Sequence, residues 1–164
     1  MATIHHIGFL VDNLESAITR WEDVTGYKFQ PIVRYCTDRW HDSSQADLHH
    51  SDVRLAFSLD GPPHIELMEF SGSGTHARAL GEGVHHLGFA QVPDVDAQLD
   101  HLRSLGIGAD GRTIGELGET ILAFNDPGDF HGVRLEYVGL APQPLLSEDG
   151  RPLRIDEHGL AVID

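Results

Sequence analysis

Apolar positions follow two periods along the chain, and the same order of periods occurs twice. A short apolar run over residues 4–11 is typical of a strand, and residues 14–24 then carry apolar side chains near helical spacing. Residues 84–92 and 95–105 repeat this order. Each half of the chain is therefore predicted to begin with a strand followed by a helix.

Both predicted helices have end signals. Asp12 or Asn13 can cap the first helix, and Gly26 can end it. The dipeptide at residues 93–94 (Pro-Asp) opens the second helix, which Gly106 closes. The two glycines are 80 positions apart, so the helices are expected to occupy equivalent places in the two halves.

Each helix is followed by three further extended segments. They cover residues 29–36, 53–59 and 64–70 in the first half, and residues 112–114, 120–125 and 133–138 in the second. The pattern is βαβββ twice, which predicts an α+β fold of two tandem modules.

The predicted organisation has four parts. Residues 1–70 form the first module, 71–83 a Gly/Ser-rich linker with a short helix over 75–80, and 84–140 the second module. The tail at residues 141–164 has weak periodicity, and three alternatives stay open for it: an extra hairpin, a partner-contacting arm, or partial disorder.

Composition narrows the class of partner. The chain has 164 residues, 40% of them apolar, and a formal net charge of −15. Such an acidic protein is not expected to bind nucleic acid or anionic membranes, because both require an excess of Lys and Arg. Cys36 is the only cysteine and no apolar run approaches the length of a membrane span, so a soluble cytoplasmic protein is expected.

Local sequences confirm that the two halves are related. The segment HHIGF at residues 5–9 reappears as HHLGF at residues 85–89, and IELM at 65–68 is similar to LEYV at 135–138. These landmarks occur in the same order in both halves. An internal duplication explains this order better than chance does.

Strand alternation places one imidazole and one carboxylate of each half on equivalent faces. His6 and His86 each share a face with a following glycine, while the larger apolar residues face the helix. The same phase puts Glu66 and Glu136 on the open side. If the halves pair with twofold pseudosymmetry, two His and two Glu converge, and this donor set suits a divalent transition metal with positions left for substrate oxygens.

These segments resemble the vicinal oxygen chelate superfamily, which includes glyoxalase I, methylmalonyl-CoA epimerase, extradiol dioxygenases and bleomycin resistance proteins. The resemblance covers about residues 4–140. It implies two βαβββ modules that form a cup-shaped, partly open β-barrel around one metal ion, and it implies a homodimer. The family's metal ligands fall on His6, Glu66, His86 and Glu136. Cobalt, nickel, zinc, manganese and iron are all compatible with this set.

Within the superfamily, the chain most resembles the methylmalonyl-CoA epimerase-like and glyoxalase I-like branch. Residues 81–86 and 52–57 are similar to the epimerases of this branch. Those epimerases carry a glutamate base shortly before the second of these segments, whereas His50 lies near that position here. An imidazole can serve as a base because its pKa is near neutrality. The alternative is that the base is absent and the substrate differs. Residues 39–42 are expected to line the mouth of the cup or to form a surface loop.

The sequence therefore predicts a metal-dependent epimerase, isomerase or lyase. Proton transfer on a small oxygenated substrate would proceed through a metal-stabilised enolate, with Glu136 as ligand and base and His50 as a second catalytic candidate. Glyoxalase-type lyase activity on thiol hemithioacetals and non-catalytic binding of an antibiotic or other small molecule are the alternatives, and a dioxygenase is less favoured. The acidity of the chain disfavours an unshielded polyanionic substrate such as a CoA thioester.

Overall fold

The computed structural model describes residues 3–163, and its elements occur in the predicted order twice. The first half contains β1 (His6–Val11), α1 (Leu14–Thr25), β2 (Val33–Asp42), β3 (His49–Phe57) and β4 (His64–Glu69). The second half contains β5 (Gly83–Val92), α2 (Val95–Ser104), β6 (Ala109–Ile114), β7 (Thr120–Asn125) and β8 (Leu135–Gly139). The predicted βαβββ duplication is confirmed.

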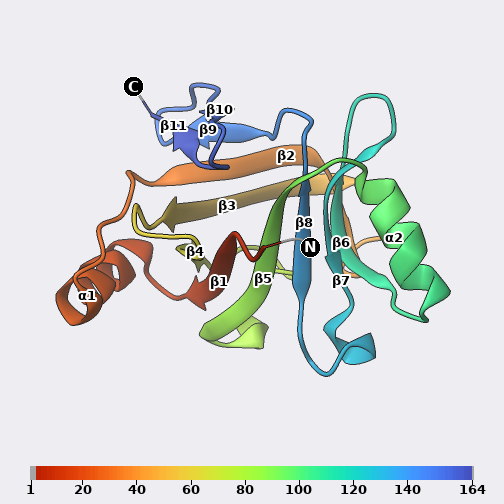
Figure 1. Cartoon of the computed structure of the whole chain (residues 1–164), viewed down its shortest axis with the longest axis horizontal. Helices are drawn as coiled ribbons and strands as arrows, with labels where there is room; N and C mark the ends of the chain where they lie inside the picture. Colours follow the sequence, from red (N-terminus) through yellow and green to blue (C-terminus); the bar gives the residue numbers. More distant parts are fainter. Residues whose placement is uncertain (1–2, 164) are drawn as a thin grey trace.

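Eight of these strands form a cup-shaped barrel. Their order is β3-β4-β1-β5-β8-β7-β6-β2, and an additional pairing of β2 with β3 closes the sheet. The parallel pairs β1–β4 and β5–β8 flank an antiparallel seam between β1 and β5. The two halves therefore meet at the middle of the sheet, with α1 and α2 at opposite ends of the molecule (Figure 1).

The helix ends are those that the sequence predicts. The side chain of Asn13 accepts a hydrogen bond from the Ser16 amide at 2.8 Å, and Gly26 ends α1 with a φ of 79°. Asp94 caps α2 through the Ala97 amide at 2.9 Å. In the described part of the chain, neither helix has the length and apolar character that a membrane span requires.

The two faces of the strands form separate cores. Val11, Leu14 and Leu67 pack outside the barrel with α1, and Leu14 is completely buried. Leu10 instead packs inside the barrel, in a cluster with Met68 and other inward-facing apolar residues. The predicted division between a helix-facing side and an open side of β1 is confirmed, and the inner side is where a binding site can form.

The second strand begins and ends later than predicted. It covers Val33–Asp42 rather than residues 29–36, while Phe29 makes only an isolated bridge to Ser58. Residues 39–42 are therefore a strand and not a loop. Trp40 explains the shift, since it is 2% exposed, pairs with Thr113 of β6 and packs on Phe124. These partners are far away in sequence, so no local signal reports them.

The connecting and terminal segments contain short elements. The helix expected over residues 75–80 is a single 3-10 turn, η1 (Arg78–Leu80), and η2 (Pro127–Asp129) precedes β8. The tail forms β9 (Leu145–Ser147), which pairs with β2, and an antiparallel hairpin of β10 (Arg154–Ile155) and β11 (Ala161–Val162). Of the three alternatives for the tail, the hairpin is present, while contact of the tail with a partner stays a prediction.

Shortening an inward side chain of the tail tests whether the tail is part of the core. Leu145 is buried in the inner cluster, so L145A should lower the free energy of unfolding by about 3 kcal/mol. Urea denaturation followed by circular dichroism measures this loss. L117A is the matched control, because Leu117 is 94% exposed and its truncation should leave stability nearly unchanged. Equal stability of the two variants would contradict the tail's place in the core.

Candidate metal centre

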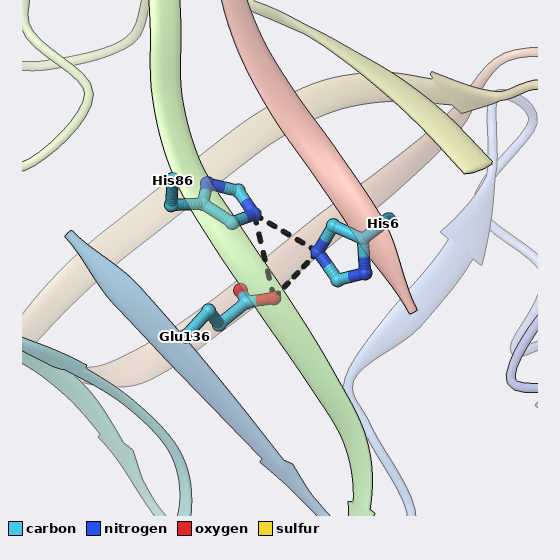
Figure 2. A group of neighbouring side chains, drawn as sticks. All are labelled: His6, His86 and Glu136. Atoms are coloured by element: carbon cyan, nitrogen blue, oxygen red, sulfur yellow. Dashed lines mark hydrogen bonds and ion pairs between the residues drawn. The ribbon is translucent and has the colours of Figure 1, made fainter. Parts of the chain in front are cut away.

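Four acidic and imidazole side chains converge inside the barrel from its four central strands. His6 lies on β1, Glu66 on β4, His86 on β5 and Glu136 on β8, and all four are at most 6% exposed. Figure 2 shows three of them, His6, His86 and Glu136, pointing toward one another. The structure thus brings together the four residues that strand phase and family resemblance select.

The pairing of the strands explains why these side chains meet. Gly8 is in register with Glu66 on one side and His86 on the other, while Gly88 is in register with His6 and Glu136. A Cβ on Gly8 would lie 2.2 Å from the His86 ring, and one on Gly88 would lie 2.0 Å from the His6 ring. Each glycine therefore leaves the volume that the opposite imidazole occupies.

The donor atoms are spaced like neighbouring ligands of one ion. The two Nε2 atoms of His6 and His86 are 2.9 Å apart, and Glu136 Oε2 lies 2.8 Å from His6 Nε2. Glu66 Oε2 lies 3.1 Å from His86 Nε2. Ligands about 2.1 Å from a metal and at right angles to each other are roughly 3.0 Å apart. His6, His86 and Glu136 also form a group whose donor atoms all lie within 4.8 Å of one another.

The electrostatics of the four residues fit a cation. Glu66 Oε2 is completely buried and has no hydrogen-bond partner within the described residues. Burial raises the pKa of Glu66 to about 7 and also raises the pKa of Glu136, while burial lowers the pKa of His86 to about 3. Neutral imidazoles beside a buried carboxylate oxygen that lacks a hydrogen-bond donor are an arrangement that a divalent cation satisfies.

A second histidine, His5, fixes the tautomer of His6. His5 Nε2 lies 2.7 Å from the carbonyl oxygen of His158, which can only accept, so Nε2 carries the proton. Nδ1 of the neutral His5 ring then accepts a hydrogen bond from His6 Nδ1 at 2.8 Å. This network leaves the Nε2 lone pair of His6 free to face the other three donors.

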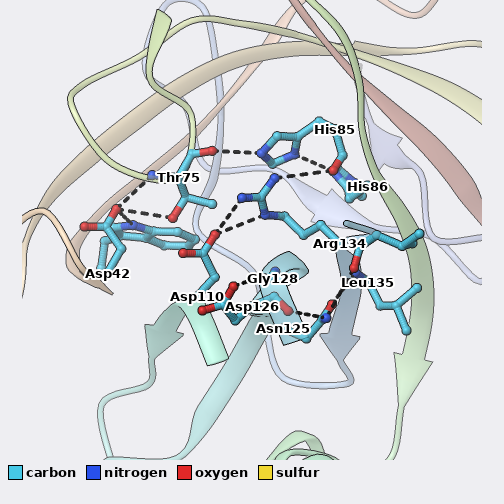
Figure 3. A network of polar contacts seen from close by, with 12 residues as sticks. Asp42, Thr75, His85, His86, Asp110, Asn125, Asp126, Gly128, Arg134 and Leu135 are labelled. Atoms are coloured by element: carbon cyan, nitrogen blue, oxygen red, sulfur yellow. Dashed lines mark hydrogen bonds and ion pairs between the residues drawn. The ribbon is translucent and has the colours of Figure 1, made fainter. Parts of the chain in front are cut away.

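The second half repeats this arrangement. His85 Nε2 donates to the Thr75 carbonyl oxygen at 2.8 Å, and His85 Nδ1 lies 2.9 Å from His86 Nδ1 (Figure 3). A β-bulge lies at His85. Gly8 pairs with His86 but Phe9 pairs with Val84, so His85 is the extra residue between them.

An acidic side chain from β2 holds the segment that contains Thr75. Asp42 accepts a hydrogen bond from the Thr75 amide at 3.2 Å (Figure 3). It also accepts one from the Trp40 indole at 2.8 Å. Burial alone would raise the pKa of Asp42, but these hydrogen bonds and those from Ser44 hold the pKa at about 2. The carboxylate therefore stays ionised and anchors the carbonyl that orients His85.

His50 lies away from the other predicted site residues. Val53 and Leu55 line the interior of the barrel, so alternation along β3 turns His50 to the outer face. Its side chain is 60% exposed, and its Nδ1 lies 2.6 Å from Asp38. The structure does not bring His50 to the four converging residues. Strand alternation selected the four converging residues from the sequence. Counting back from Val53 with the same period of two places His50 on the outer face, so the sequence could have indicated its position.

A cavity of about 390 Å³ opens inside the barrel beside the four residues. His6, Glu66 and Glu136 lie on its wall. Other polar residues of this region were not singled out from the sequence: His5, His85, His76, Tyr35 and Gln143. For His5 and His85, the signal was the duplicated His-His pair. For the other three there was none, because only the tertiary packing brings them to the site.

Comparisons with known proteins agree with this geometry. The family model described as "Glyoxalase/Bleomycin resistance protein/Dioxygenase superfamily" matches residues 5–124. A variant of Streptomyces coelicolor methylmalonyl-CoA epimerase in complex with 2-nitronate-propionyl-CoA is 25% identical, with a TM-score of 0.58, covering 87% of this chain and 98% of its own. Methylmalonyl-CoA epimerase from Mycobacterium tuberculosis is 27% identical, with a TM-score of 0.54 and coverage of 84% and 87%. No curated protein sequence matches the chain.

Filling the space left by a central glycine should weaken metal binding. In G88A the new methyl group would collide with the His6 ring, displacing it and weakening Co²⁺ or Zn²⁺ binding by at least about tenfold, with a loss of roughly 1–3 kcal/mol in stability. Metal content after dialysis and urea denaturation measure both. G108A is the control, because the nearest atom there is a side-chain oxygen of Asp129 at 3.3 Å. Full metal content in G88A would contradict the assignment.

Removing the hydrogen bond to His86 should weaken the binding of the same ion without unfolding the protein. H85L leaves His86 without its acceptor, so metal affinity should fall about 10–100-fold. H85Q can donate to the Thr75 carbonyl and accept from His86, and it should recover much of the loss. Calorimetric titration with Zn²⁺ measures these affinities. Unchanged affinity in H85L would show that the orientation of His86 does not depend on this contact.

Proposed function

Because the chain belongs to the glyoxalase/bleomycin resistance/dioxygenase superfamily, we propose that it is a metal-dependent epimerase, isomerase or lyase that transfers a proton on a small oxygenated substrate. One observation carries this proposal. Two imidazoles and two carboxylates converge on one point of the barrel interior, and three of them line the adjoining cavity. Structural neighbours that are methylmalonyl-CoA epimerases support an epimerase-type activity.

The residues that would hold the metal are His6, Glu66, His86 and Glu136. The orphaned oxygen of Glu66 supports this assignment, since a cation between the four side chains would satisfy it. The two glycines support it as well, because they leave room for the imidazoles to reach that point. A bound divalent cation supplies Lewis acidity, which polarises a carbonyl and stabilises negative charge on its oxygen. The two carboxylates would balance the charge of such an ion inside the barrel.

Glu136 is the proposed base. Its carboxylate lines the cavity, so it can reach the C–H group of a ligand held there. In the proposed step Glu136 takes a proton from the carbon beside the substrate carbonyl. The electron pair of the broken C–H bond moves toward the carbonyl oxygen, and the proton is later returned to the same or a neighbouring atom.

Metal-dependent exchange of substrate hydrogen with solvent deuterium tests the proposal. We expect the metal-loaded protein to exchange the acidic C–H of a panel of α-hydroxyketones and 2-acyl thioesters, and E136Q to lower the rate at saturating metal at least about 100-fold. Mass spectrometry measures the incorporation.

E66Q is the matched variant, because Glu66 is the counterpart of Glu136 in the first half. Both substitutions remove one carboxylate from the proposed ion, so E66Q should weaken metal binding but retain more exchange at saturating metal. Absence of exchange across the panel in protein shown to contain metal would refute the proposed function. Equal rates in the two variants would refute the role of Glu136.

A further inference from the structure

The C-terminal tail forms one wall of the cavity. Ten of the 29 residues that line the cavity lie between residues 141 and 161, and they include Leu145, Leu153 and Ala161. This segment lies beyond residue 124, where the match to the family model ends. β9 attaches the tail to β2, and the contact from His5 to the His158 carbonyl attaches it to the metal centre. The wall is therefore a fixed part of the site.

The cavity offers little to a large anion. Among residues 3–163, Arg154 is the only Lys or Arg that lines it, and Asp156 lies nearby on the same wall. Recognition of the phosphates of a nucleotide requires several cations or backbone amides in place. The chain also has a net charge of −15, which repels a polyanion. At about 390 Å³, the space is near the small end of ligand pockets.

One polar group on the wall remains available to a ligand. His76 is 7% exposed and lines the cavity, where its ring packs against those of Trp40, His85 and Phe124. Burial lowers its pKa to about 3, so the ring is neutral. No residue among 3–163 hydrogen-bonds to its ring nitrogens. By contrast, Tyr35 on the same wall already bonds Thr113 and Gln143.

Building on the proposed function, we infer that the substrate is a compact, largely apolar molecule with two neighbouring oxygens, enclosed by the tail and hydrogen-bonded through a further hydroxyl or carbonyl to His76. A CoA thioester is excluded by this inference. The apolar body of the ligand would contact Leu153 and Leu145 of the tail and Leu55 of β3, while its oxygen pair faces Glu66 and Glu136.

Binding of unreactive probes tests this inference separately from the reaction. Benzohydroxamate combines a compact apolar ring with two neighbouring oxygens, and free CoA carries the phosphates. We expect calorimetry on the metal-loaded protein to detect benzohydroxamate and to detect no CoA binding at millimolar concentration. L153W narrows the cavity from the tail and should weaken benzohydroxamate binding at least about tenfold, whereas L117W at an exposed site should not.

Ring-hydroxylated benzohydroxamates test His76. One isomer or more should bind the native protein about 2–10-fold more tightly than the parent probe, which is the worth of a typical hydrogen bond. H76L should remove this advantage and H76N should retain part of it. CoA binding as tight as that of benzohydroxamate, unchanged affinity in L153W, or no effect of H76L would each overturn the inference. A lack of deuterium exchange with intact probe binding would instead overturn only the proposed reaction.

Discussion

The register of the antiparallel seam between β1 and β5 is the constraint on which the rest of the structure depends. Across this seam Gly8 faces His86 and Gly88 faces His6, so each imidazole occupies the volume where the opposite residue has no side chain. A slip of one residue would turn every side chain of a strand to the other face. The parallel partners β4 and β8 then bring Glu66 and Glu136 into register with the same two glycines. One register thus brings the donor atoms of these four side chains close together.

This arrangement has an electrostatic cost that the surrounding residues reduce only in part. Two carboxylates are buried, and one of their oxygens lacks any hydrogen-bond donor within the described residues. The histidine pairs orient the imidazoles, but they bring no positive charge, because burial lowers the pKa of His85 and His86 alike. A cation between the four side chains would supply the missing charge. Because it would bind only the folded arrangement, its binding free energy would add to folding stability.

The sequence predicted those parts of the molecule that depend on local periodicity. Strand alternation assigned Leu10 and Val11 to opposite faces of β1 and selected the four converging residues. It could do so because a period of two can be found without knowing the distant partners of a strand. The position of β2 was wrong because Trp40 belongs to the strand through contacts with Thr113 and Phe124. His50 was chosen by its resemblance to a family position, although its phase along β3 turns it outward. His76 gave no sequence signal, since the rings that surround it come from three separate elements.

The duplicated and the unduplicated parts of the fold contribute different features to the site. The duplicated strands give each half the same imidazole, glycine and carboxylate, so the symmetric part of the fold is the part that suits a metal. The tail has no counterpart after the first module, and it pairs with β2 and covers one wall of the cavity. The segment between the modules places His76 on the same cavity, again without a counterpart. A symmetric cup would present two equivalent faces to a ligand. These two unduplicated segments make the faces different, which is what an enzyme requires to hold an asymmetric substrate in one orientation.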